Sequence, residues 1–332
     1  MLTFHRWNRF PYLRPVVKLF LGNRAGVLLL IPVIVSLYFL LNYQTNYYIQ
    51  NSTSNLGLWG DAVVIFPLIA NISAGILITI NAFGINWLFN TNEFLERNSY
   101  MSSLLYVVLM SFYHSFYSLD GLLIAHTCII ILLYQLFKLR QNEDGRKAVF
   151  NGAFFAGVAA SFHPPMVALI PFVLIMLWNI RPFVFRETIL AILAFSIPLI
   201  YAAVFVWYNE HSIDLKILEQ TSNYFKKQTD FLVTAVLFTL LFLLSLLSIR
   251  GKMQKSSIRL KKLVRILWWL VGVGILYGLA DFIFFGQIER FSFLMIPLSF
   301  FLTFSFSNKT FGIVAMVLFY LTLIYSLINF FQ

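Results

Sequence analysis

The sequence predicts an all-α polytopic membrane protein with about eleven membrane segments. Of its 332 residues, 60% are hydrophobic and 11% are charged, and the mean hydropathy is +0.82. A water-soluble domain usually has about a quarter of its residues charged, so that class is excluded. Apolar runs of about 20 residues, long enough to cross a bilayer, recur from Ala25 to Phe331. We therefore expect residues 25–332 to form one transmembrane domain.

The first 24 residues combine positive charge with aromatic side chains. Their basic residues are Arg6, Arg9, Arg14, Lys18 and Arg24. This pattern is typical of an amphipathic helix at the cytoplasmic interface, and the first apolar run lacks the small-residue cleavage site of a signal peptide. The net charge is +11. Because the basic residues lie beside predicted spans, we expect contact with membrane lipids and no binding of nucleic acid.

The orientation of the spans follows from Lys and Arg, which mark cytoplasmic loops. Residues 44–60 contain no charge and are expected outside, whereas residues 250–265 contain seven basic residues and no acidic one and are expected inside. The expected spans are Ala25–Tyr43, one beginning near Asp61, Ser99–Phe116, Gly121–Phe137, Thr188–Tyr208, Phe231–Ile249, Val264–Phe285, Phe291–Phe306 and Phe311–Phe330. This topology places the N-terminus in the cytoplasm and the C-terminus in the periplasm of a bacterial inner membrane.

One long apolar stretch, Lys147–Arg181, is broken near its middle by His163, Pro164 and Pro165. A straight helix does not pass easily through two prolines, because each removes an amide donor and clashes with the preceding turn. Positive charge stands at both ends, and two further spans separate Arg186 from the basic loop 250–265. Both ends are then cytoplasmic. We expect two short crossings or a re-entrant hairpin, with His163 at its tip.

Few ionisable residues lie at the outer side, and each has two interpretations. Asp61 either caps the second span or acts as a general base or metal ligand at an outward-facing cleft. His163 either satisfies backbone groups freed by the prolines or takes part in proton transfer or phosphate binding. Arg290 either extends to lipid phosphate or clamps a lipid-linked phosphate, with Glu289 as its neighbour in a simple surface pair.

Three further residues have simpler expectations. Asp120 is expected to cap the helix that follows it, and His114 to lie in the same outer turn. The single cysteine, Cys128, lies within an apolar run and is expected in the core. No cluster of Cys and His has the spacing of metal ligands, so we expect neither a metal site nor another cofactor, and nothing supports a divalent cation.

Three segments resemble the GT-C class of multi-pass glycosyltransferases. They are residues 92–99 running into Leu104-Leu105-Tyr106, residues 148–171 around the His-Pro-Pro break, and Glu289-Arg290-Phe291 followed by Pro297. The resemblance implies sugar transfer from a polyprenyl-phosphate donor at the outer face. It also implies Asp61 as base, Arg290 as phosphate clamp, and His163 and Glu289 as substrate-binding residues. Active members usually carry acidic residues in the first outer loop, where this chain offers only Asp61.

A second resemblance covers more of the chain. Residues 20–24, Phe162-His163-Pro164-Pro165 and Arg181-Pro182-Phe183 are similar to an uncharacterised family of bacterial inner-membrane proteins of similar length. That family implies no assigned chemistry. The alternative to an enzyme is therefore a non-catalytic scaffold, or an accessory subunit bound to membrane proteins of an envelope export or assembly complex.

Overall fold

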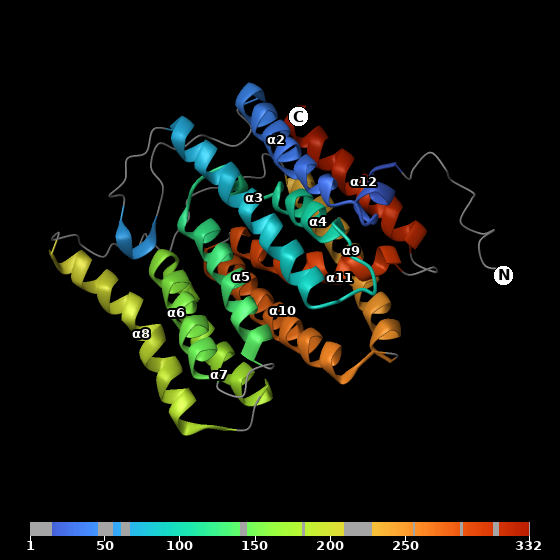
Figure 1. Ribbon diagram of the computed structural model, residues 1–332. Helices are drawn as coiled ribbons and strands as arrows, with labels where there is room; N and C mark the ends of the chain where they lie inside the picture. The colour runs from blue at the N-terminus through green and yellow to red at the C-terminus, as the bar shows by residue number, and fades with distance from the viewer. Residues whose placement is uncertain are drawn as a thin grey trace.

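A computed structural model describes residues 15–45, 56–60, 67–139, 145–180, 183–208, 228–254, 256–285, 288–307 and 312–331, and it contains no strand in these ranges (Figure 1). The α-helices are α1 (Pro15–Phe20), α2 (Leu30–Thr45), α3 (Pro67–Thr91), α4 (Met101–Met110), α5 (Gly121–Leu139), α6 (Arg146–Phe162), α7 (Leu169–Ile180), α8 (Phe185–Tyr208), α9 (Gln228–Gln254), α10 (Ile258–Phe285), α11 (Met295–Ser307) and α12 (Gly312–Ile328). Short 3₁₀ helices are η3 (Ala25–Leu29), η4 (Gly57–Trp59), η5 (His114–Phe116), η6 (Pro164–Ala168), η8 (Glu289–Leu294) and η9 (Asn329–Phe331).

Eight helical segments in the described part of the chain are long and apolar enough to cross a membrane. They are Ala25–Thr45, Ile69–Thr91, Gly121–Leu139, Phe185–Tyr208, Val233–Gln254, Ile258–Phe284, Glu289–Ser307 and Gly312–Phe331. The shorter helices α4, α6 and α7 account for the other three predicted segments. The chain is therefore an all-helical polytopic membrane protein, as its composition predicts.

The third predicted span, Ser99–Phe116, is wrong in length. The structure has only ten α-helical residues there, Met101–Met110, followed by the turn that contains η5. Ten residues extend about 15 Å, half the thickness of a bilayer. Every residue of α4 is buried, and the helix packs against α3 and α11. Hydropathy alone does not separate a buried half-length helix from a lipid-facing span, which explains the error.

The break at His163 is confirmed. Helix α6 ends at Phe162, and η6 begins at Pro164 and leads into α7. The backbone N–H of His163 donates to the carbonyl of Ala159 at 2.8 Å and closes α6. Helix α7 packs back on α6, and α6 itself lies between α5 and α8 (Figure 1). The segment is thus a helical hairpin with His163 at its tip.

Contacts at the two ends of the bundle agree with the predicted sidedness. At one end, the two loops expected inside meet, because Arg259 pairs with Glu93 at 3.2 Å and Lys252 with Glu96 at 3.7 Å. At the hairpin tip, Trp59 of the uncharged loop stacks on Phe162 with ring centroids 5.8 Å apart. The tip therefore belongs to the end expected outside. The identity of the membrane and the absolute orientation of the termini stay predictions.

Only residues 15–24 of the predicted interfacial segment are described. Within them, α1 presents Phe20 to the core with 1% of its surface exposed, and Lys18 is exposed. The backbone N–H of Tyr100 donates to the carbonyl of Phe20 at 2.8 Å. This bond ties α1 to the turn before α4.

Candidate functional site

Polar side chains gather where the hairpin tip meets η8 and the C-terminal part of α10. The guanidinium of Arg290 lies 2.8 Å from a carboxylate oxygen of Asp281. Its Nε donates to Nε2 of His163 at 3.2 Å, so the imidazole accepts there and carries its proton on Nδ1. Arg290, Asp281 and His163 are 3%, 1% and 4% exposed. One arginine thus joins three elements that are far apart in sequence.

The backbone of the proline break has its own partner. The hydroxyl of Tyr277 in α10 donates to the carbonyl of Pro165. Tyr277 thus takes the role of backbone partner that was one interpretation of His163, while a role of His163 in proton transfer or phosphate binding stays a prediction. A tyrosine bonds a carbonyl of the break, whereas the imidazole of His163 faces Arg290.

Glu289 does not form the surface pair with Arg290 that was one of its two interpretations. It is 4% exposed, and its Oε1 accepts a hydrogen bond from the backbone N–H of His114 at 3.2 Å. Its other oxygen, Oε2, has no hydrogen-bond partner among the described residues. Glu289 is therefore a buried carboxylate, one oxygen of which makes no hydrogen bond within the described ranges.

Asp120 lies in the same turn between α4 and α5 as His114. Its Oδ1 accepts from the backbone N–H of Leu123 at 2.8 Å, which confirms it as the cap of α5. Burial raises the pKa of the Asp120 carboxyl to about 7. Asp120 and Asp281 both act electrostatically on Glu289. The cluster therefore contains three carboxyl groups and one guanidinium, an arrangement suited to proton abstraction as well as to binding.

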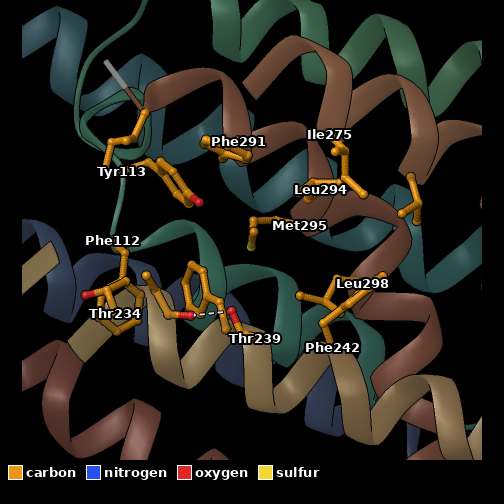
Figure 2. Close-up of a pocket in the computed structure, with 14 residues that line it drawn as sticks. Phe112, Tyr113, Thr234, Thr239, Phe242, Ile275, Phe291, Leu294, Met295 and Leu298 are labelled. Atoms are coloured by element: carbon orange, nitrogen blue, oxygen red, sulfur yellow. Dashed lines mark hydrogen bonds between the residues drawn. The ribbon is translucent and has the colours of Figure 1, made fainter. Parts of the chain in front are cut away.

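An apolar cleft opens beside this cluster, and residues of α9, α10, η8 and α11 line it (Figure 2). Its volume is about 320 Å³. The lining residues are Phe112, Tyr113, Thr234, Ala235, Phe238, Thr239, Phe242, Val271, Ile275, Ile288, Phe291, Leu294, Met295 and Leu298. We call it the α9–α10 cleft.

The cleft lies between two helices, α9 and α10, that diverge from each other (Figure 1). Near mid-length of α9, the rings of Phe242 and Trp268 lie 6.3 Å apart, and Phe242 also lines the cleft. Two of its lining residues, Ile288 and Phe291, flank Glu289 and Arg290 in sequence. The charged cluster therefore lies at the edge of an apolar space large enough for part of a hydrocarbon chain.

Three of the four residues singled out from the sequence, His163, Glu289 and Arg290, come together in this region. The fourth, Asp61, lies outside the described residues. The sequence did not identify Asp281 as the partner of Arg290. A signal was present, because a carboxylate at the end of an apolar run requires a buried partner, and Asp281 stands in such a run.

No group of three or more His, Cys, Asp or Glu residues that could hold a metal ion occurs in the described part of the chain. A scan against family models found no match to this sequence, and neither did searches of curated proteins and of solved structures. The resemblance to the GT-C class therefore stays a prediction, and the function is argued from the geometry of the cluster and the cleft.

Proposed function

We propose that this membrane protein is a GT-C-like glycosyltransferase that takes a sugar from a polyprenyl-phosphate carrier at the outer face. One observation carries the proposal. The α9–α10 cleft is apolar, and the residues at its edge flank the buried pair Glu289 and Arg290. A polyprenyl-phosphate sugar has the same division, with a hydrocarbon chain joined to an anionic, hydroxyl-rich head.

In this proposal the described residues bind different parts of the donor. The cleft holds part of the prenyl chain, and Arg290 binds the phosphate through its planar set of donors. Asp281 and His163 hold the guanidinium in place at 2.8 and 3.2 Å. No divalent cation is needed for this arrangement, since the guanidinium itself supplies positive charge.

A carboxylate then serves as base. It accepts the proton of the acceptor hydroxyl, whose oxygen forms a bond to the anomeric carbon of the sugar. The bond between that carbon and the phosphate oxygen breaks, and polyprenyl phosphate leaves with the electron pair. Glu289 suits this role because its Oε2 is unpartnered within the described part of the chain. Asp61, the base implied by the resemblance, is the other candidate.

Release of polyprenyl phosphate tests the proposal. Purified protein in liposomes is given polyprenyl-phosphate hexose and a membrane extract as the source of acceptor. We expect Glu289→Gln or Asp61→Asn to abolish release while bound donor is still detected by native mass spectrometry. Arg290→Lys should weaken donor binding, because lysine lacks the bidentate fork. Glu96→Gln, at an exposed position, is the control. Unchanged release in both carboxylate variants contradicts the proposal.

A second candidate is a non-catalytic scaffold in an envelope export or assembly complex. The observation that favours it is the state of Arg290, which is 3% exposed and already paired with Asp281. Such a cluster also serves as a purely structural clamp between η8, α10 and the hairpin tip. We then expect partner proteins to co-purify after extraction in mild detergent, and Asp61→Asn to leave function intact. A protein that purifies alone counts against this candidate.

A further inference from the structure

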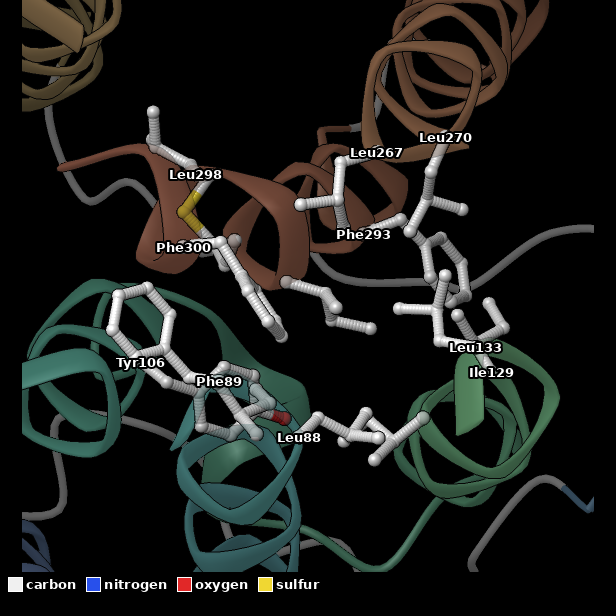
Figure 3. Close-up of a cluster of buried hydrophobic side chains, with 14 of the residues drawn as sticks. Leu88, Phe89, Tyr106, Ile129, Leu133, Leu267, Leu270, Phe293, Leu298 and Phe300 are labelled. Carbon is white, nitrogen blue, oxygen red and sulfur yellow. The ribbon is translucent and has the colours of Figure 1, made fainter. Parts of the chain in front are cut away.

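A line of buried polar side chains runs from the charged cluster into the middle of the bundle. Its centre is His126 of α5, which is 0% exposed. Nδ1 of His126 lies 3.1 Å from the hydroxyl of Tyr106, and Nε2 lies 3.2 Å from the hydroxyl of Ser292. Figure 3 shows Tyr106 and Phe293, the residue after Ser292, among the apolar side chains of the core. Both imidazole nitrogens are thus hydrogen-bonded to hydroxyl groups inside an apolar core.

The line continues toward the cytoplasmic end through the hairpin of α3 and α4. Asn81 Nδ2 donates to the hydroxyl of Tyr106 at 3.5 Å, and the hydroxyl of Ser102 donates to Asn86 Oδ1 at 3.3 Å. Ser102 and Tyr106 are four residues apart and share one face of α4. Next along α3, Asn90 exchanges two hydrogen bonds with the backbone of Ser99 at 3.0 and 3.1 Å.

At its inner end the line reaches a polar cavity. Asn90 lines a space of about 750 Å³, together with Glu93, Glu96 and Lys252 of the predicted cytoplasmic face. The polar pairs therefore lead from the middle of the core to the surface at this end.

At its outer end the line passes through the cluster described above. Ser292 and Glu289 are three residues apart on the 3₁₀ helix η8, where such positions eclipse each other. Glu289 accepts from the backbone of His114, and Nδ1 of His114 lies 3.0 Å from the hydroxyl of the half-buried Ser118. Hydrogen-bonded polar pairs therefore recur from one face of the bundle to the other, and helical spacing alone connects Ser292 to Glu289 and Tyr106 to Ser102.

We propose that this line, from Ser118 through His126 to Asn90, is a hydrated proton pathway between the two faces, with His126 as its relay. An imidazole bonded on both nitrogens takes a proton at one and releases a proton from the other. Asn81 Oδ1 is buried without a hydrogen-bond partner in the described part of the chain, and such an oxygen is a site for an internal water molecule. The pathway does not depend on the proposed transferase activity.

A purely structural role explains each pair but not their order. Interhelical hydrogen bonds in membranes stabilise by only about 0.6 kcal/mol on average, and polar side chains within spans are costly. Pairing alone does not require the pairs to be placed end to end across the bundle. Proton conduction does require that order, because each transfer needs a neighbour within hydrogen-bonding reach or one water away. In the proposed pathway, water bridges the steps from Ser292 to Glu289 and from Tyr106 to Ser102, where the described side chains make no direct hydrogen bond.

Proton flux into liposomes tests the pathway. The full-length protein is reconstituted with a pH-sensitive dye inside, and a potassium gradient with valinomycin drives proton entry. We expect the internal pH to change faster than in protein-free liposomes. His126→Gln keeps an amide that bonds both hydroxyl groups but cannot carry a proton, so the rate should fall to the protein-free value. Cys128→Ala, on the same helix and outside the line, should keep the wild-type rate.

Two results overturn the proposal. One is a wild-type rate equal to that of protein-free liposomes, and the other is a wild-type rate retained in His126→Gln. Size-exclusion profiles and melting midpoints establish that the variants are folded. If His126→Gln does not fold, Ser292→Ala is used instead, because it removes one of the two hydroxyl partners with a smaller change in volume. An unchanged proton flux in Ser292→Ala then contradicts the proposed pathway.

Discussion

At the scale of single residues, the buried ion pair between Arg290 and Asp281 is the feature with the most stringent energetic requirements. A charge in an apolar interior is tolerated only when it is paired and its hydrogen bonds are made. Here Asp281 Oδ1 lies 2.8 Å from the guanidinium, and Asp281 Oδ2 accepts from the backbone N–H of Arg290 at 3.4 Å. The pair therefore fixes η8 against α10 and gives η8 its place beside the cleft.

Removing one partner of this pair should be strongly destabilising. Asp281→Asn leaves the guanidinium of Arg290 buried without a counter-charge, which costs about 3–5 kcal/mol for a buried pair. Unfolding in mixed detergent micelles, followed by circular dichroism, measures the loss. Glu96→Gln is the control, because Glu96 is 93% exposed and its pair with Lys252 is long at 3.7 Å. Equal losses in the two variants would show that burial does not set the cost.

Asp120 predicts a pH dependence of stability. Its pKa is about 7 in the fold against an ordinary value of 3.8, so between these values the unfolded state holds fewer protons than the folded state. Stability contributed by this group is therefore lost as the pH rises through that range. Asp120→Asn keeps an oxygen for the N–H of Leu123 but does not titrate. The melting midpoint of the wild type should fall more than that of the variant between about pH 5 and pH 8. An equal fall of the melting midpoint in the wild type and in Asp120→Asn would contradict the raised pKa of Asp120.

At the scale of elements, small residues allow α6 to lie in close contact with α8. A Cβ added at Gly157 would lie 2.3 Å from the carbonyl oxygen of Phe195 in α8, closer than van der Waals contact permits. Backbones approach this closely in membrane bundles where one residue has no side chain. Glycine at this position therefore sets the distance between the two helices, and with it the position of the hairpin tip.

Alanine substitutions at two glycines should distinguish the cost of this close contact from the general effect of alanine on helix stability. Gly157→Ala forces α6 and α8 apart, and overpacking of this kind costs about 1–3 kcal/mol. Gly272→Ala in α10 adds the same methyl group where nothing lies within 4 Å, so stability should hold or rise slightly. Melting midpoints of the two variants in detergent provide the measurement. A similar midpoint for both would refute the close-contact argument.

The helices also show which structural features a sequence pattern predicts and which it does not. The His-Pro-Pro break was predictable because proline acts on the residues next to it. The half-length of α4 was not, since Ser99–Phe116 is apolar throughout most of its length whether it faces lipid or protein. Only the helices packed around α4 decide that it is buried.

At the scale of the whole molecule, the even number of crossings between Lys147 and Arg186 determines the topology. The hairpin returns the chain to the side from which it came, and α8 then crosses from Arg186 to Tyr208. If α6 and η6–α7 formed one straight span, every later loop would be inverted. The contact of Arg259 with Glu93 at 3.2 Å agrees with the hairpin.

Cysteine labelling from one side of the membrane tests this topology. In a Cys128→Ala background, which removes the only native cysteine, we expect Lys147→Cys, Arg186→Cys and Lys261→Cys to react with an impermeant maleimide from the cytoplasmic side alone. Tyr208→Cys, at the opposite end of α8 and 80% exposed, should react only from the other side. Labelling of Lys147→Cys and Arg186→Cys from opposite sides would exclude the hairpin.

The sequence by itself determined the fold class, the positions of most membrane segments and the break at His163, and it predicts the sidedness of the loops. These properties depend on local hydropathy, proline and charge, which act over a few residues. The tertiary structure decided which polar groups meet. Arg290 finds Asp281 and His163, Glu289 finds His114, and His126 joins Tyr106 to Ser292. Such pairs join residues up to 175 positions apart, so their selection depends on how the helices pack and not on any local pattern.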